Sequence, residues 1–124
     1  MNKRKSNSVY TMIGSDVEIE GSISLKQGII IYGQVHGDVK TEGPVRIAQY
    51  GLVDGNVTGL DVRVGGTVLG NINSSGQVIL GEKCVLKGDI IYRKLLIEDG
   101  AQFQGSCSVI GNKENTIDSS KGLK

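Results

Sequence analysis

Few side chains in this chain of 124 residues are suited to acid–base or nucleophilic chemistry. The candidates are one histidine, His36, and two cysteines, Cys84 and Cys107. Nucleophilic catalysis needs a base beside the nucleophile, usually a histidine, and a zinc site needs three or four protein ligands. Neither cysteine belongs to a C-x-x-C pair, and both are expected to be inert free thiols, with Cys107 buried as a small apolar residue. The sequence therefore predicts no catalytic residues, no metal site and no cofactor, and places His36 at a surface corner.

Two further patterns resemble ligand sites only in part. Gly28 and Gly33 have the spacing of a phosphate-binding loop, but Gln34 and Val35 follow where such a loop has Lys and Ser or Thr. Acidic pairs such as Glu98-Asp99 lack the Gly-Asp nonapeptide of calcium-binding coils. We therefore expect neither nucleotide nor calcium as a ligand.

The composition limits the classes of protein to which the chain can belong. Its length predicts one domain, and 14 basic against 13 acidic residues, a net charge of +1, predict no nucleic-acid partner. No apolar run is long enough for a transmembrane helix. The first residues lack the apolar segment of a secretory signal, and two cysteines make no disulfide framework. An intracellular protein, in the cytoplasm, is expected.

The apolar residues point to strands. The chain has 13 Val and 14 Ile against 9 Leu, and β-branched side chains pack well on a pleated surface. Its 19 glycines are scattered so closely that a stable helix has little room, since each interior Gly costs a helix about 1 kcal/mol. An all-β fold with short strands and tight corners follows.

An internal repeat of about 17 residues orders these strands. The tripeptide Gly-x-(Ile/Val) occurs as Gly21-Ser22-Ile23, Gly37-Asp38-Val39, Gly55-Asn56-Val57, Gly70-Asn71-Ile72 and Gly88-Asp89-Ile90, and the series closes with Gly105-Ser106-Cys107. A second column, two residues before each of these glycines, holds Ile19, Val35, Val53, Val68, Leu86 and Phe103. A third column holds the pairs Ile29/Ile31, Val45/Ile47, Val62/Val64, Val78/Leu80 and Leu95/Ile97, preceded by Ile13.

Three apolar columns in each period predict a three-sided coil, a single-stranded parallel β-helix of triangular section. We expect about six coils over residues 13–110, forming a rod about 30 Å long at the usual spacing between strands. A left-handed β-helix built on hexapeptides, the fold of some acyltransferases, is the alternative. Steps of six fit the stretch from Ile72 to Leu96 but slip at Gln102.

Polar segments flank the coil. Residues 1–12 are basic, with Lys3, Arg4 and Lys5 and no acid, and residues 111–124 have little to bury. Both are predicted to be disordered tails. The coil between them has eight basic and eleven acidic residues, a net charge of −3.

The two ends of the predicted rod have no evident cap. An uncapped coil exposes unpaired backbone groups and a slice of core, which favours contact with another open end. Phe103, the only Phe, lies near the last coil, where it can close the core or anchor the next molecule. The expected polymer interface consists of Phe103, Ile97, Leu95 and Cys107 at one end and Ile13 and Ile19 at the other.

The recurrent Gly-(Asp/Asn)-(Val/Ile) coils and the closing stretch Lys94–Gly105 (KLLIEDGAQFQG) resemble the bactofilins, bacterial polymer-forming cytoskeletal proteins. The resemblance covers residues 13–110. It implies a right-handed coil that assembles end to end without nucleotide, with a Phe of the last coil, here Phe103, supporting polymer contacts. The implied partners are further copies of the chain, the inner membrane surface and client proteins, in cell shape, polar localisation or motility.

Some members of that family attach to the membrane through a short N-terminal segment. The corresponding residues here are Lys3, Arg4, Lys5, Val9, Tyr10 and Met12. Basic residues near an anionic leaflet contribute about 1 kcal/mol each, so one copy would bind weakly and a filament with many copies more strongly.

Two other functions stay open at this point. A left-handed β-helix enzyme of the acyltransferase type would form trimers and would need His36 as its base. A monomeric adaptor would offer a flat β face to a protein partner. The state of assembly distinguishes both from a filament.

Overall fold

The fold was analysed in a computed structural model that describes residues 11–110, and every regular element there is a β-strand. The strands form three parallel sheets of six, here named A, B and C. Sheet A contains β1 (Thr11–Ile13), β4 (Ile29–Ile31), β7 (Val45–Ile47), β10 (Val62–Val64), β13 (Gln77–Leu80) and β16 (Lys94–Ile97). Sheet B contains β2 (Glu18–Glu20), β5 (Gln34–His36), β8 (Leu52–Val53), β11 (Thr67–Leu69), β14 (Val85–Lys87) and β17 (Gln102–Gln104). Sheet C contains β3 (Ile23–Leu25), β6 (Val39–Thr41), β9 (Val57–Gly59), β12 (Ile72–Ser74), β15 (Ile90–Tyr92) and β18 (Cys107–Val109).

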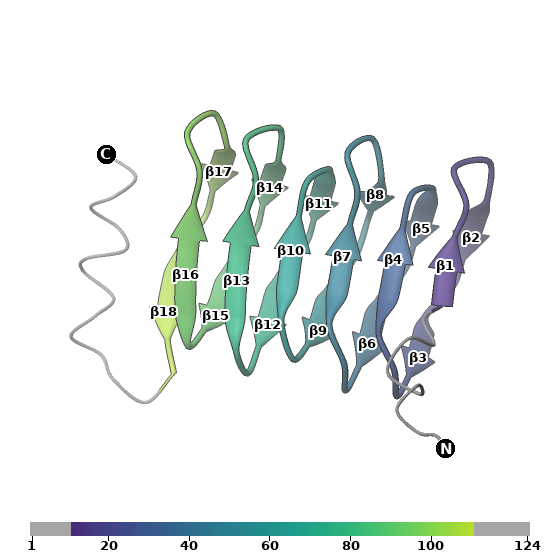
Figure 1. Ribbon diagram of the computed structural model, residues 1–124, viewed down its shortest axis with the longest axis horizontal. Helices are drawn as coiled ribbons and strands as arrows, with labels where there is room; N and C mark the ends of the chain where they lie inside the picture. The colour runs from purple at the N-terminus through teal and green to yellow at the C-terminus, as the bar shows by residue number, and fades with distance from the viewer. Residues whose placement is uncertain (1–10, 111–124) are drawn as a thin grey trace, which may run out of the picture.

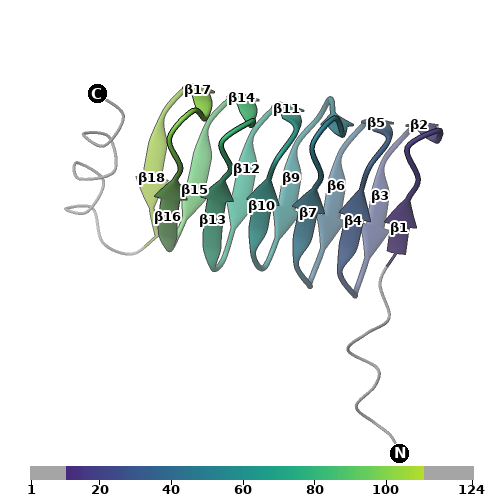
Figure 2. The same ribbon diagram turned by 45° about the horizontal axis from the view of Figure 1, so that its top comes forward.

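Each strand pairs in parallel with the strand three places later in the chain, so the polypeptide winds through sheets A, B and C in turn (Figure 1). Six such coils lie side by side along the long axis, as the turned view also shows (Figure 2). The predicted all-β, parallel, three-sided coil is confirmed, and so is its number of coils. Its handedness stays a prediction.

The core is a narrow column of aliphatic side chains inside the coil. Strands such as Val62–Val64 alternate, with Val62 and Val64 buried and Arg63 exposed. Because the parallel register stacks Val62 on Val45 and on Val78, like residues lie above like along the rod. Each coil therefore adds a similar thin layer, which β-branched side chains fill for the most part.

Sheet C contributes a second inward column that the apolar repeat did not predict. It contains Leu25, Thr41, Gly59, Ser74, Tyr92 and Val109. Tyr92 is 2% exposed, so the coil does bury one aromatic ring. The buried hydroxyls are paired: Ser74 Oγ donates to Leu60 O at 2.7 Å and accepts from Gly76 N at 3.0 Å, and Thr41 Oγ1 makes the equivalent contacts with Gln27 O and Gly43 N.

The first strand begins earlier than the sequence predicts. Thr11 and Met12, assigned to the N-terminal tail, belong to β1, where Thr11 lies opposite Ile29 and Met12 opposite Ile30. The coil extends to them because the Thr11 N–H donates to Gly28 O at 3.0 Å. The predicted tails otherwise lie outside the described residues.

A ladder of side-chain hydrogen bonds stabilises the corner before sheet C. The Asp or Asn that follows Gly37, Gly55, Gly70 or Gly88 accepts, through Oδ1, the backbone N–H of the equivalent residue in the next coil. The bonds run from Asn56 N to Asp38, from Asn71 N to Asn56, from Asp89 N to Asn71 and from Ser106 N to Asp89, at 2.9, 3.0, 2.9 and 3.1 Å. This ladder explains the Asp and Asn of the repeat.

At the same corner, the backbones of successive coils approach each other so closely that only glycine fits. A Cβ on Gly70 would overlap the carbonyl oxygen of Gly55 in the preceding coil. The same overlap, with the carbonyl oxygen of the equivalent glycine in the preceding coil, would occur at Gly37, Gly55, Gly88 and Gly105. Any side chain here would push two coils apart and weaken the ladder between them.

We therefore expect Gly70→Ala to lower the free energy of unfolding by about 2–3 kcal/mol, because an added methyl group cannot be accommodated without moving backbone. Gly14→Ala is the matched control. Its Cβ would meet Asp16 Oδ1 at 3.4 Å and Val17 Cγ2 at 3.8 Å, which are ordinary contacts. Urea unfolding of both variants measures the difference, and equal stabilities would contradict the steric argument.

Candidate functional site

The two ends of the coil differ from its middle because their strands have a neighbour on one side only. β1, β2 and β3 are the terminal strands of the three sheets at one end of the rod, and β16, β17 and β18 at the other (Figure 1). Part of the backbone N–H and C=O groups of these six strands faces away from the coil. Such edges are templates for pairing with another chain.

At the C-terminal end the core is open. Phe103 and Leu95 are partly exposed, whereas Leu86 and Val78, directly below them in the preceding coil, are 0% exposed. Ile97 is likewise partly exposed. The predicted interface residues of this end thus lie together on the terminal coil. Cys107 lies on the same coil and is better covered, with 6% of its surface exposed.

At the N-terminal end, both predicted residues lie on the first coil, Ile13 in β1 and Ile19 in β2. Ile19 is partly exposed, and Ile13 is 7% exposed. The structure adds residues that the sequence reasoning did not assign to an end: Ile23 and Leu25 here, and Val109 at the other end. They occupy the inward columns of sheet C. The place of Ile23 in the first Gly-x-Ile tripeptide could have identified it as a residue of the first coil.

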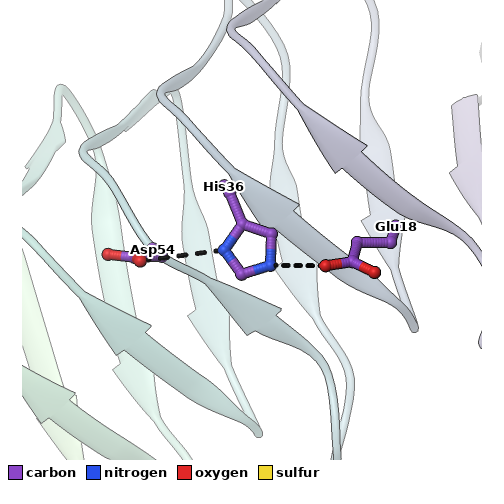
Figure 3. A network of polar contacts seen from close by, with 3 residues as sticks. All are labelled: Glu18, His36 and Asp54. Atoms are coloured by element: carbon purple, nitrogen blue, oxygen red, sulfur yellow. Dashed lines mark ion pairs between the residues drawn. The ribbon is translucent and has the colours of Figure 1, made fainter.

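His36 is the centre of a polar network on the outer face of sheet B (Figure 3). Its Nε2 lies 3.1 Å from Glu18 Oε2, and its Nδ1 lies 3.7 Å from Asp54 Oδ2. The three residues come from successive coils. Both ring nitrogens face carboxylates, so neither is directed at a nucleophile, and the network connects three coils across the surface. This arrangement favours the surface interpretation of His36 over the role of catalytic base.

Both cysteines are free and buried. Burial raises the pKa of the Cys84 thiol to about 11. Burial, and secondarily the charge of Asp89, raises the pKa of Cys107. A thiol whose pKa is raised in this way is a poor nucleophile, which agrees with the expected inert state of both residues.

The Cys84 thiol makes stability depend on pH in the alkaline range. The unfolded thiol has a pKa of about 8.5, below its folded value, so the unfolded state loses its proton first as the pH rises. Cys84 therefore stabilises the fold fully below about pH 8.5, and this contribution is lost between there and about pH 11. Cys84→Ala should show a stability gap to wild type that narrows from about pH 8 to about pH 10.5.

Urea unfolding at both pH values measures that gap. Ser108→Ala, an exposed change on the last coil, is the control, and its gap should stay constant. A constant gap for Cys84→Ala would contradict the raised pKa.

The glycine pair Gly28 and Gly33 has a structural explanation. The residues between them form β4, and the Cβ of an alanine at Gly33 would overlap the carbonyl oxygens of Gly14 and Val17. Within residues 11–110 no group of three or more His, Cys, Asp or Glu side chains is arranged to hold a metal ion. The feature of the coil that offers the most to a partner is therefore its pair of open ends.

Comparison with known proteins agrees with this geometry. The family model for bactofilins, described as polymer-forming cytoskeletal, matches residues 11–108. The chain belongs to the bactofilin family. It is 34% identical to bactofilin BacO of Myxococcus xanthus over 96 residues, which is 77% of this chain and 76% of BacO. It is 31% identical to bactofilin BacP of the same organism over 100 residues, which is 81% of this chain but 42% of BacP. No solved structure matches the chain.

As a bactofilin, the chain is a polymer-forming cytoskeletal protein. The matched region begins at Thr11, the first residue of β1, and ends within β18. The family model thus covers the six coils, including the end coils with the exposed core residues. The resemblance noted in the sequence is confirmed over this region.

The predicted membrane-contact residues are placed only in part. Lys3, Arg4, Lys5, Val9 and Tyr10 lie outside the described residues. Met12 is 61% exposed on the outer face of β1. Between residues 11 and 110, no helix has the length and apolar character needed to cross a bilayer.

Proposed function

We propose that this bactofilin assembles end to end into filaments without nucleotide, and that the filaments act as a scaffold at the inner face of the cell membrane. The observation that carries the proposal is the partly exposed core at both ends of the coil. In the part of the chain that the structure describes, three parallel strands at each end lack their outer neighbour. A second molecule placed there continues the ladders and covers the apolar side chains.

Physical chemistry favours such stacking over isolated rods. Phe103, Leu95 and Ile97 remain partly in contact with water at one end, and Ile19 and Ile23 at the other. Removing apolar surface from water is favourable by about 25 cal/mol per Å². Because the coil is thin, one end contact is small, and interfaces of low area are weak individually. Filament growth is therefore expected to depend on protein concentration.

Nucleotide independence is supported by the chain's own residues. The segment with the glycine spacing of a phosphate loop is strand β4 inside sheet A. It supplies ladder hydrogen bonds and two core residues, Ile29 and Ile31, which are 0% exposed. The structural role of this segment leaves it no freedom to enclose phosphates.

The first experiment is assembly of the purified protein without nucleotide at micromolar concentration, followed by sedimentation and negative-stain imaging. We expect filaments, with the same mass in the pellet whether or not ATP and GTP are added. A protein that stays monomeric would contradict end-to-end assembly and favour the adaptor. Assembly only with nucleotide would contradict the second part of the proposal.

The second experiment changes Phe103, which lies at the C-terminal end in register with Leu86. Phe103→Arg should abolish pelleting, because a charge on the stacking face loses its hydration without gaining a partner. Leu69→Arg, on the outer face of sheet B where Leu69 is 38% exposed, is the matched control and should assemble normally.

Circular dichroism and thermal unfolding show whether both variants keep the fold. Phe103→Ala, which adds no charge, should weaken assembly and leave the coil folded. Filaments formed by a folded Phe103→Arg protein would assign Phe103 the role of closing the core instead.

A further inference from the structure

The outward positions of sheet A form one straight row along the rod. The register of the six strands places Met12, Ile30, Arg46, Arg63, Ile79 and Leu96 in this order. We call this set the sheet A row. Two arginines lie side by side at its centre, and two apolar residues follow on each side. Met12 is 61% exposed at one end and Leu96 47% at the other.

The arginines of this row have no ionic partner among residues 11–110. The ion pairs among residues 11–110 are the two of His36, and neither Arg46 nor Arg63 takes part in them. Neighbouring strands are about 4.8 Å apart, so two like charges in register repel each other. An anion placed between them would relieve this repulsion, and a guanidinium group binds phosphate oxygens in a bidentate manner.

Charge is distributed unequally among the three sheets. The strands of sheet A contain Arg46, Arg63 and Lys94 and no acidic residue. Those of sheet B contain Glu20, Lys87 and Glu18, which belongs to the His36 network, and those of sheet C contain Lys40 and no acidic residue. Sheet A is therefore the most basic of the three sheets in a rod with a net negative charge.

Acidic residues occur only at the borders of sheet A. Asp61, beside the shallow hollow between the two arginines, uses Oδ1 to accept the Gln77 N–H at 2.9 Å. Glu98 directly follows β16, and Glu82, in the turn after β13, lines a second hollow with Arg46 and Arg63. All three belong to corners, so the outward positions of the strands themselves carry no acidic side chain.

We propose that sheet A is the face of the filament that lies on an anionic lipid surface. Arg46 and Arg63 bind lipid phosphates, and Met12 and Leu96 enter the headgroup region. The inference rests on the proposed membrane scaffold and assigns it a face. A flat sheet with central positive charge and exposed apolar residues matches the charge and the shape of such a surface. β1, the first described strand, belongs to this sheet, and Met12 lies at its N-terminal end.

The test is co-sedimentation of the full chain with phosphatidylcholine vesicles that contain about 30% phosphatidylglycerol, at low and high salt. Each basic residue near such a surface changes affinity about fivefold, so Arg46→Gln combined with Arg63→Gln should weaken binding about 25-fold. Lys40→Gln combined with Lys87→Gln removes equal charge from the outer faces of sheets C and B. This control should change binding less than about threefold.

A second pair of variants tests the apolar part of the face. Met12→Ser combined with Leu96→Ser keeps every charge and should also weaken vesicle binding. Its remaining binding should still weaken at high salt, as we expect for the wild type. Unchanged binding by this pair would overturn the insertion of the apolar residues.

Several results would overturn the whole proposal. The arginine double variant could bind as tightly as wild type, which would assign the contact to residues 1–10. The lysine control could lose as much affinity as the arginine variant, or wild type could bind no vesicles while it captures a polyglutamate peptide. Filaments imaged in the same samples without lipid keep the proposals distinct. Normal filaments with either variant result would contradict only the lipid-facing sheet, whereas wild-type filaments that bind no vesicles would also contradict the membrane scaffold.

Discussion

The parallel backbone ladder between successive coils is the interaction on which this structure depends. Every strand inside the rod bonds to one strand before it and one after it in the stack, 15–18 residues away in most pairs. The described strands do not pack across a thick core. Side chains such as Val62 and Leu86 are therefore buried by the same stacking of coils that forms the hydrogen bonds. A ladder of this kind has no natural end, and within residues 11–110 its two terminal coils keep unpaired edges and partly exposed core residues.

Close spacing of the coils determines what the corners accept. At the corner before sheet C, Gly70 lies against the backbone of Gly55, and Asn71 bonds to the next coil through its side chain. The first leaves no room for a Cβ, and the second pairs a backbone N–H that the strands do not use. Stacking of one molecule on another requires no new kind of contact, because it repeats the coil-to-coil contact that the chain already makes five times.

The outward side chains are free of these constraints, and the three faces have diverged. Sheet B has a network that joins Glu18, His36 and Asp54 across three coils, while sheet A has adjacent arginines and exposed aliphatic residues. In a polymer the ends are consumed by assembly. The faces then remain exposed, so a filament of one fold can carry distinct surfaces along its length.

The sequence by itself determined the class, the six coils, the inward columns of sheets A and B, the first inward column of sheet C and the repeat glycines, since alternation of period two and a 17-residue repeat are local signals. It also indicated Phe103 and Ile19 as residues of opposite ends. It could not reveal the column of Thr41, Ser74 and Tyr92, because these residues are not uniformly apolar. Thr41 and Ser74 are tolerated inside because their hydroxyls bond to backbone groups of neighbouring corners. Only the tertiary structure decided which outward residues are neighbours: Arg46 and Arg63 lie 17 positions apart in the chain, and the register of two strands brings them together.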